Sequence, residues 1–119
     1  MVFLLTVIFE YDNITFGMHD FKAAFFKTLS HPTRLRILDA LRAGELTVGE
    51  VQEKLEVAQS TASQHLAALR AGDFVDARRA GTSVWYRVSD TAIWELLDLA
   101  RDIYERQLLK NRAIFEARR

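Results

Sequence analysis

The chain has 119 residues, in which 16 lysines and arginines balance 16 aspartates and glutamates, and it has no cysteine. This length suits one domain and is too short for two. The absence of cysteine excludes disulfides, thiolate metal sites, cysteine nucleophiles and thiol redox sensing, and it fits a reducing cytoplasm. Zero net charge does not support nucleic-acid binding, for which a basic domain is typical, but it does not exclude binding, because phosphates are neutralised locally.

The N-terminal stretch Met1–Phe9 is almost wholly apolar. No basic residue precedes it and no small-residue cleavage site follows it, so it does not fit a signal peptide. It is also far too short for a membrane span, which needs about 20 apolar residues, and no membrane partner is expected. Residues 1–17 are therefore interpreted as an extra arm or as a stretch before a natural start at Met18, and residues 18–119 as the folded domain.

Apolar residues recur at helical spacing in the next part of the chain. Pro32 favours the first turn of a helix because it lacks an N–H donor, and Gly44 favours the end of one. Thr47, with Glu50 three residues later, forms a capping-box pattern. These signals predict four helices, at His19–Leu29, Pro32 to about Arg42, Thr47 (as N-cap) to about Leu55, and Gln59–Arg70.

Two strand-like segments follow Gly72. Phe74–Arg79 and Ser83–Val88 flank a glycine-containing turn, and the second segment alternates in side-chain character, which predicts a β-hairpin. Asp90 is then placed to cap a long final helix from Thr91 to about Glu116. The expected fold class is mainly α with a small β-hairpin.

The central feature is the pair of short helices joined by the tight turn 56–58. In a helix-turn-helix the second helix enters the major groove of DNA, which is about 12 Å wide. Its exposed face must be narrow and must carry hydrogen-bonding groups, and the amides here match adenine edges. The candidate base-reading residues are Gln59, Ser60, Thr61, Ser63 and Gln64. The alternative is an ordinary amphipathic helical hairpin with a solvated polar face.

The predicted hairpin favours the DNA-binding interpretation. Arg78 and Arg79 lie just before its turn, and Arg87 lies after it. A β-wing with basic residues near its tip can reach phosphates or the minor groove beside a recognition helix. Taken singly, each arginine is equally compatible with a solvated turn.

Three blocks of the sequence together resemble the ArsR/SmtB family of bacterial winged helix-turn-helix repressors. Phe26–Leu38 is similar to that family's signature across its first two helices, Gln59–Gly72 to its recognition helix, and Arg79–Val88 to its wing. The blocks occur in the family's order and spacing, and the match runs from about Phe21 to Tyr104. A cysteine-free subgroup of the family is the most similar.

The resemblance implies a domain of four helices, a two-stranded wing and a fifth helix, spanning 18–119 and assembling as a homodimer. It implies a transcriptional repressor that binds an inverted-repeat operator in double-stranded DNA. Positions that match Gln59, Ser60, Ser63 and Gln64 contact DNA in the family. Wing positions that match Arg78, Arg79 and Thr82 lie near the backbone or the minor groove.

The apolar stripe of the final helix supports self-association, because it is too wide and too long for a small domain to cover. The alternative is that this helix folds back on its own core. In the family the helix packs beside the first helix of both subunits. The expected interface residues are Phe21, Phe25, Leu96, Ala100, Ile103 and Tyr104.

No metal or cofactor is expected. Thr47 and Gly49 stand where one family metal site has cysteines, and of the family's ligand positions on the last helix only Asp90 offers a ligand here. A zinc site normally needs three or four converging ligands, whereas the three histidines lie on different elements. The inducer stays open: a small molecule, a partner protein, or none if repression is constitutive.

Other classes of function fit less well. Ser63 and His65 are two residues apart on one helix and do not face each other, and no glycine-rich phosphate loop is present, so an enzyme is not expected. A protein-interaction module that has lost DNA binding is disfavoured by the polar helix face and the wing arginines. His65 is interpreted as structural. One of Arg34 and Arg36 is interpreted as a contact to phosphate or, equally, as part of a surface ion pair.

Overall fold

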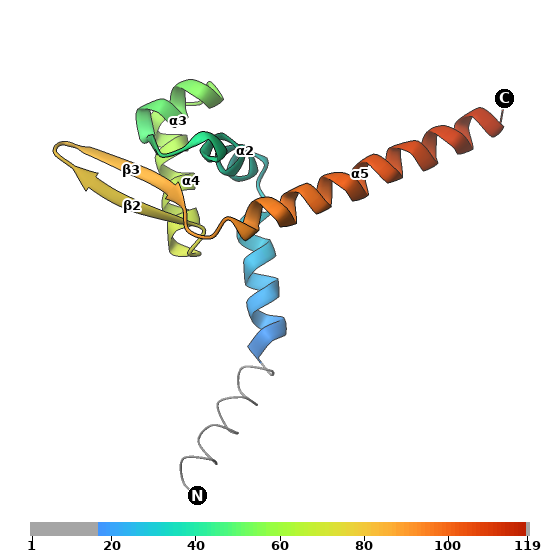
Figure 1. The fold of residues 1–119 in the computed structure, drawn as a ribbon, viewed down its shortest axis with the longest axis horizontal. Coiled ribbons are helices and arrows are strands. Elements are labelled where there is room, and N and C mark those ends of the chain that lie inside the picture. Colours follow the sequence, from blue (N-terminus) through green and yellow to red (C-terminus); the bar gives the residue numbers. More distant parts are fainter. Residues whose placement is uncertain (1–16, 119) are drawn as a thin grey trace, which may run out of the picture.

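The computed structural model describes residues 17–118 (Figure 1). Residues 17–29 are helical. The elements that follow are α2 (Pro32–Ala40), the 3-10 turn η1 (Leu41–Ala43), β1 (Leu46–Thr47), α3 (Val48–Leu55), α4 (Gln59–Ala71), β2 (Val75–Ala80), β3 (Ser83–Val88) and α5 (Ala92–Ala117). All the predicted helices and the hairpin are present. The interpretation of 1–17 concerns residues that, apart from Gly17, lie outside the described part.

One apolar core joins α2, α3, α4 and the base of the hairpin. Each of these helices carries apolar residues three and four positions apart, so that one face of each is buried. The clearest case is α4, whose residues Ala62, Leu66 and Leu69 have no exposed surface. This core holds α4 through its buried face alone, so the opposite face of α4 is not needed for packing. The buried residues are Leu29, Ile37, Leu38, Leu41, Leu46, Val51, Leu55, Ala62, Leu66, Leu69, Phe74, Val75 and Ile93.

A third strand, β1, extends the hairpin into a sheet with the order β1-β3-β2. Leu46 pairs with Tyr86 and Thr47 with Trp85, in antiparallel register. The sequence did not indicate this strand, because two residues are too few to show an alternating pattern. The strand links the loop before α3 to the hairpin, and it thereby fixes the base of the wing to the helix-turn-helix.

The wing itself is the hairpin of β2 and β3, which extends away from the helices (Figure 1). Its register pairs Val75 with Val88 at the base and Ala80 with Ser83 at the tip. Gly81 occupies the turn with a φ of 63°, a left-handed conformation that glycine adopts without steric cost. The predicted glycine turn is therefore confirmed, and the tip lies well outside the core.

The final helix, α5, has 26 residues, of which only the first two turns pack on the domain. Asp90 accepts a hydrogen bond from the N–H of Ala92 at 2.9 Å, so its predicted capping role is confirmed. Ile93 is buried, whereas the described residues from Asp98 onward are exposed and the helix runs away from the body (Figure 1). Folding back of this helix onto its own core is excluded. No helix within residues 17–118 is both long and apolar enough to cross a membrane.

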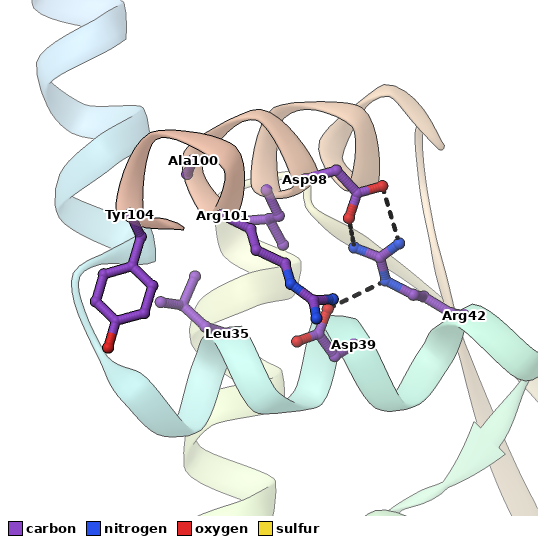
Figure 2. A pocket seen from close by; sticks show the side chains of 8 residues that line it. Leu35, Asp39, Arg42, Asp98, Ala100, Arg101 and Tyr104 are labelled. Atoms are coloured by element: carbon purple, nitrogen blue, oxygen red, sulfur yellow. Dashed lines mark hydrogen bonds and ion pairs between the residues drawn. The ribbon is translucent and has the colours of Figure 1, made fainter. Parts of the chain in front are cut away.

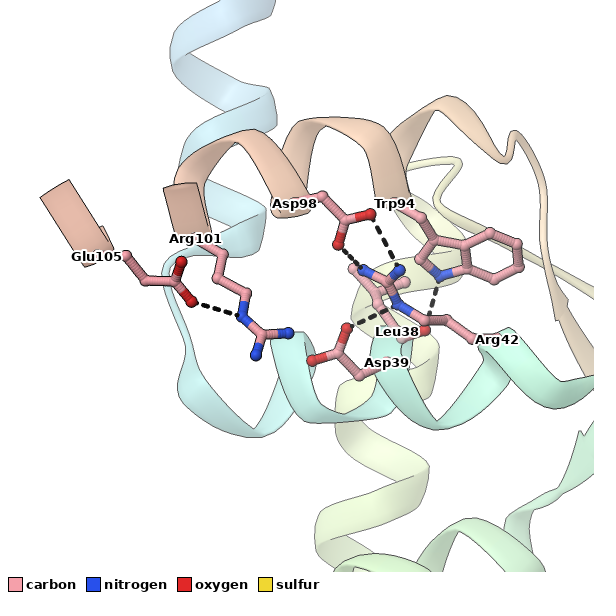
Figure 3. A network of polar contacts seen from close by, with 7 residues as sticks. All are labelled: Leu38, Asp39, Arg42, Trp94, Asp98, Arg101 and Glu105. Atoms are coloured by element: carbon pink, nitrogen blue, oxygen red, sulfur yellow. Dashed lines mark hydrogen bonds and ion pairs between the residues drawn. The ribbon is translucent and has the colours of Figure 1, made fainter. Parts of the chain in front are cut away.

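A polar network fixes the direction in which α5 leaves the domain (Figure 3). Arg42 of η1 donates to both carboxylate oxygens of Asp98, at 2.8 and 3.3 Å, and to Asp39 at 3.1 Å. The indole N–H of Trp94 donates to the carbonyl oxygen of Leu38 at 2.9 Å. The hydrogen bond from Arg42 lowers the pKa of Asp98 below its usual value. Because one guanidinium joins two elements, α2 and α5 are expected to move together.

Candidate nucleic-acid interface

The helix-turn-helix consists of α3, the turn at 56–58 and α4. Thr47 caps α3 by accepting the N–H of Glu50 at 3.2 Å, as the capping-box pattern predicted. Glu56 ends α3 in the left-handed region, with φ 56° and ψ 47°. Arg36 donates to the carbonyl oxygen of Leu55 at 2.9 Å, where the helix dipole places partial negative charge. Arg36 therefore stabilises the turn, and its contact with phosphate stays a prediction.

The two faces of α4 differ sharply in exposure. Opposite the buried Ala62, Leu66 and Leu69 lies a polar face on which four of the five candidate base-reading residues are exposed. The fifth, Thr61, is half-buried and contributes less surface. The exposed candidates are Gln59, Ser60, Ser63 and Gln64. A narrow polar ridge of this kind suits the floor of the major groove.

The N-terminal end of α4 is left uncapped. Its N-cap residue is Ala58, which has no side chain able to accept a hydrogen bond. The first N–H groups of a helix then have no partner within the helix, and the helix dipole places partial positive charge at this end. A DNA phosphate beside the recognition helix would supply the missing acceptor.

The cations of the wing have different surroundings. Arg78 donates to Glu45 at 2.6 Å, and its hydrogen bond lowers the pKa of Glu45 below its usual value. Arg87 lies 3.9 Å from Asp76, at the outer limit of an ion pair. Arg79 is exposed and has no ion-pair partner within residues 17–118, and Thr82 is exposed in the turn. Of the two predicted wing arginines, only Arg78 is held in an ion pair within residues 17–118, and contact of either with phosphate stays a prediction.

A cluster of basic side chains joins α2 to α4. Arg34 donates from Nε to Nδ1 of His65 at 3.1 Å and from a terminal nitrogen to the carbonyl oxygen of Thr28 at 2.9 Å. The ring of His31 lies 5.8 Å from that of His65. The structural interpretation of His65 agrees with these contacts, and Arg34 makes internal hydrogen bonds rather than a surface ion pair. Burial, with Arg34 and His31 nearby, lowers the pKa of His65 below 6.5.

This lowered pKa predicts acid sensitivity. The unfolded chain takes up a proton on His65 near pH 6.5, whereas the folded chain resists protonation until lower pH. The free energy of unfolding should therefore fall as pH drops below 6.5 toward the lowered pKa, and His65 should have no such effect above that window. His65→Asn keeps an acceptor for Arg34 but does not titrate. Urea unfolding at about pH 7.5 and about pH 5 should show a smaller acid loss in this variant than in the parent.

His19→Asn is the matched control, because His19 is exposed and lies on the helical stretch 17–29, away from the cluster. This variant should lose stability in acid as the parent does. If His65→Asn retained the parent's full acid loss, protonation of His65 would not be the origin of the effect.

Exposed large apolar side chains gather on two elements. Every such side chain within residues 17–118 lies on the helical stretch 17–29 or on α5, and none lies on the helix-turn-helix or the wing. Of the predicted interface residues, Phe21, Ala100, Ile103 and Tyr104 are exposed, whereas Phe25 and Leu96 are half-buried against the core. Soluble monomers rarely expose large apolar side chains gathered in this way.

An open groove of about 690 Å³ lies between α2 and the start of the exposed part of α5 (Figure 2). Leu35 and Tyr104 form its apolar side, and Arg101 lies across it near Asp39 (Figure 2). The Arg42–Asp98 contact closes one end. A molecule in this groove would contact both α2 and the projecting part of α5. No group of three or more metal-ligating side chains occurs anywhere in 17–118.

Comparison with known proteins places this fold in a family. Residues 29–78 match the model of a helix-turn-helix domain. The HTH-type transcriptional regulator Rv0081 of Mycobacterium tuberculosis is 39% identical over 100 residues, which cover 83% of this chain and 88% of that protein. This chain belongs to the ArsR/SmtB family of winged helix-turn-helix transcriptional regulators. The crystal structure of Rv0081 matches this ArsR/SmtB regulator with a TM-score of 0.72, over 79% of this chain and 95% of that one.

Two further relatives of this ArsR/SmtB regulator bear on assembly and activity. The homodimeric winged helix-turn-helix DNA-binding domain Mb0332 of Mycobacterium bovis is 34% identical, with a TM-score of 0.68 over 75% of this chain and 82% of that one. The biofilm growth-associated repressor of Agrobacterium fabrum is 46% identical over 54 residues, which span 45% of this chain and 46% of that repressor. The expectation of a transcriptional regulator rather than an enzyme is confirmed.

Proposed function

We propose that this regulator is a repressor that binds an inverted-repeat operator as a homodimer in the bacterial cytoplasm, and that residues 18–119 form its DNA-binding and dimerisation domain. The exposed polar face of α4 carries the proposal. It lies opposite a fully buried apolar face, so the helix can be presented to DNA without disturbing the core. Gln59, Ser60, Ser63 and Gln64 would meet base edges, with Thr61 at the margin.

The exposed apolar surface of 17–29 and α5 supports the homodimer. A second copy would cover Phe21, Ile103 and Tyr104, all of which are largely exposed in one chain. The homodimeric relative from Mycobacterium bovis has the same fold. Two-fold symmetry would set the two copies of α4 about one DNA turn, or roughly 34 Å, apart, which requires an operator with inverted half-sites.

The operator can be sought first in the promoter upstream of the gene for this protein. We expect a gel shift of that duplex at protein concentrations that leave a scrambled duplex unbound, and increased transcription when the gene is deleted. Decreased transcription after deletion would indicate an activator. The absence of any shift, even at low salt, would contradict DNA binding itself.

Arg79 and Thr82 are proposed to hold the DNA backbone beside α4. Arg79→Ala should weaken binding to all duplexes, because a phosphate contact is independent of sequence. Each phosphate contact contributes about 0.9 to the slope of log affinity against log salt concentration. A dimer would lose this contact from both of its wings, so the slope should flatten by about 1.8. Fluorescence anisotropy titrations at several salt concentrations measure this slope. Arg106→Ala, on the exposed part of α5, should leave it unchanged, and an unchanged slope in Arg79→Ala would exclude the contact.

An inducer is proposed to act through the groove between α2 and α5. Leu35 and Tyr104 provide an apolar side, and the Arg42–Asp98 ion pair lies at the edge. A small molecule or a partner protein bound there would alter the angle between α5 and the helix-turn-helix, and with it the spacing of the two recognition helices. Binding that left operator affinity unchanged would exclude this route.

A further inference from the structure

The three arginines of the wing are divided between the two faces of its sheet: Arg78 and Arg87 lie on one face, and Arg79 lies on the other. Side chains that face each other across an antiparallel pair lie on the same face. Arg78 pairs with Trp85, and Arg87 pairs with Asp76, two residues before Arg78 on the same strand. Arg79 pairs with Val84 and is one residue from Arg78, so its side chain lies on the other face. Val75 is buried in the core with α4, so the face of Val75 and Arg79 is the side of the sheet on which α4 lies. Arg78 lies on the opposite face.

Glu45 reaches Arg78 from the loop before β1. It precedes Thr47 by two residues, and Thr47 pairs with Trp85, which places Glu45 on the same outer face as Arg78. The guanidinium and the carboxylate are 2.6 Å apart, a short charge-assisted hydrogen bond. The side chain of Glu45 is 29% exposed and that of Arg78 is 56% exposed. A phosphate that approached Arg78 would have to displace a partly covered carboxylate of the same charge.

We propose that Glu45 is a positioning residue that withholds Arg78 from the DNA backbone and so limits the sequence-independent part of DNA binding. This inference rests on the proposed DNA-binding function and refines its wing contacts. The pair Glu45–Arg78 carries no net charge, so it releases no counterions from DNA. Arg79, together with Thr82, then supplies the backbone contacts of each wing, and discrimination between sequences is left to α4.

The proposal predicts a gain of binding when an acidic residue is neutralised. Glu45→Gln keeps the shape of the side chain and removes its charge, so that Arg78 becomes an uncompensated cation. Affinity for a non-specific duplex at low salt should rise several-fold. The slope of log affinity against log salt should steepen by about 0.9 for each freed arginine, or about 1.8 for a dimer. Anisotropy titrations with a scrambled duplex over a range of salt concentrations measure both quantities.

Two further variants separate this effect from a general change in charge. Arg78→Ala alone should leave the salt slope near that of the parent, and Arg78→Ala in the Glu45→Gln background should cancel the gain. Asp102→Asn removes the same charge from the exposed part of α5 and should change neither quantity. A merely structural role for Glu45 would alter the unfolding midpoint without steepening the slope.

The proposal is overturned if Glu45→Gln leaves the slope unchanged, or if Arg78→Ala alone flattens it as much as Arg79→Ala does. Either result would leave the proposed function intact, provided that the parent binds its operator and Arg79→Ala weakens that binding. If the parent bound no duplex at any salt concentration, the proposed function itself would fail.

Discussion

Replacement of Ser63 and Gln64 together by alanine should weaken operator binding by about three orders of magnitude. Each base contact contributes about 1–3 kcal/mol of discrimination, and a dimer would lose two contacts from each subunit. Even at the lower figure of about 1 kcal/mol each, the four contacts total about 4 kcal/mol, which corresponds to roughly a thousandfold in affinity. Both side chains are exposed, so the free energy of unfolding should stay close to that of the parent. Titration of labelled operator, with urea unfolding alongside, measures the two effects.

The scrambled duplex is the internal control for this pair of substitutions. Binding to it depends on phosphates, so its affinity and salt slope should hardly change. Gln107→Ala, which removes the same amide from the exposed part of α5, should leave operator binding intact. An equal loss on the operator and on the scrambled duplex would mean that α4 does not read bases.

Ile103→Asp should convert the dimer into monomers and reduce operator affinity by a factor of about 10²–10⁴, the advantage that linkage of two binding modules confers. Ile103 is 45% exposed in the single chain, so it has little part in the fold of one subunit. In a dimer it would be covered, and a buried unpaired carboxylate opposes association. Sedimentation equilibrium gives the mass, and operator titration gives the affinity.

Ile103→Leu preserves the apolar surface and should remain dimeric with the parent's affinity. Phe21→Asp, on the helical stretch 17–29, tests the other half of the proposed interface, because Phe21 is 65% exposed. Far-UV circular dichroism establishes whether each variant keeps its helices. A folded Ile103→Asp variant that stayed dimeric would show that this face of α5 is not the interface.

Many local features of this protein follow from neighbouring residues along the chain. The faces of α4 follow from apolar residues three and four positions apart, and the capping of α3 from Thr47 and Glu50. The hairpin follows from alternation around Gly81, and the start of α5 from Asp90. Helix ends were less sharply predicted: the helix begun by Pro32 ends at Ala40 and continues as a 3-10 turn to Ala43. Such signals need only short-range contacts, which explains why they can be recognised in the sequence.

The sequence predicts the residues of the candidate site about as well as it predicts the helices and the hairpin. The polar residues of α4 were identified correctly as an exposed group, except that Thr61 is half-buried. The wing arginines were recognised as cations near the tip, but nothing in the local pattern distinguished Arg78 from Arg79. Strand alternation could have placed them on opposite faces, yet the partner of Arg78 lies 33 positions earlier in the chain.

Contacts between distant parts of the chain account for what local patterns did not reveal. Strand β1 exists because β3 lies beside it, since two residues cannot form a strand without a partner. The role of Arg34 depends on His65, 31 positions away, and the direction of α5 depends on Arg42 and Asp98, 56 positions apart. Side-chain partners of this kind are chosen by geometry after the core has packed. In the wing, that geometry pairs Arg78 with Glu45 and leaves Arg79 without an ion-pair partner within residues 17–118.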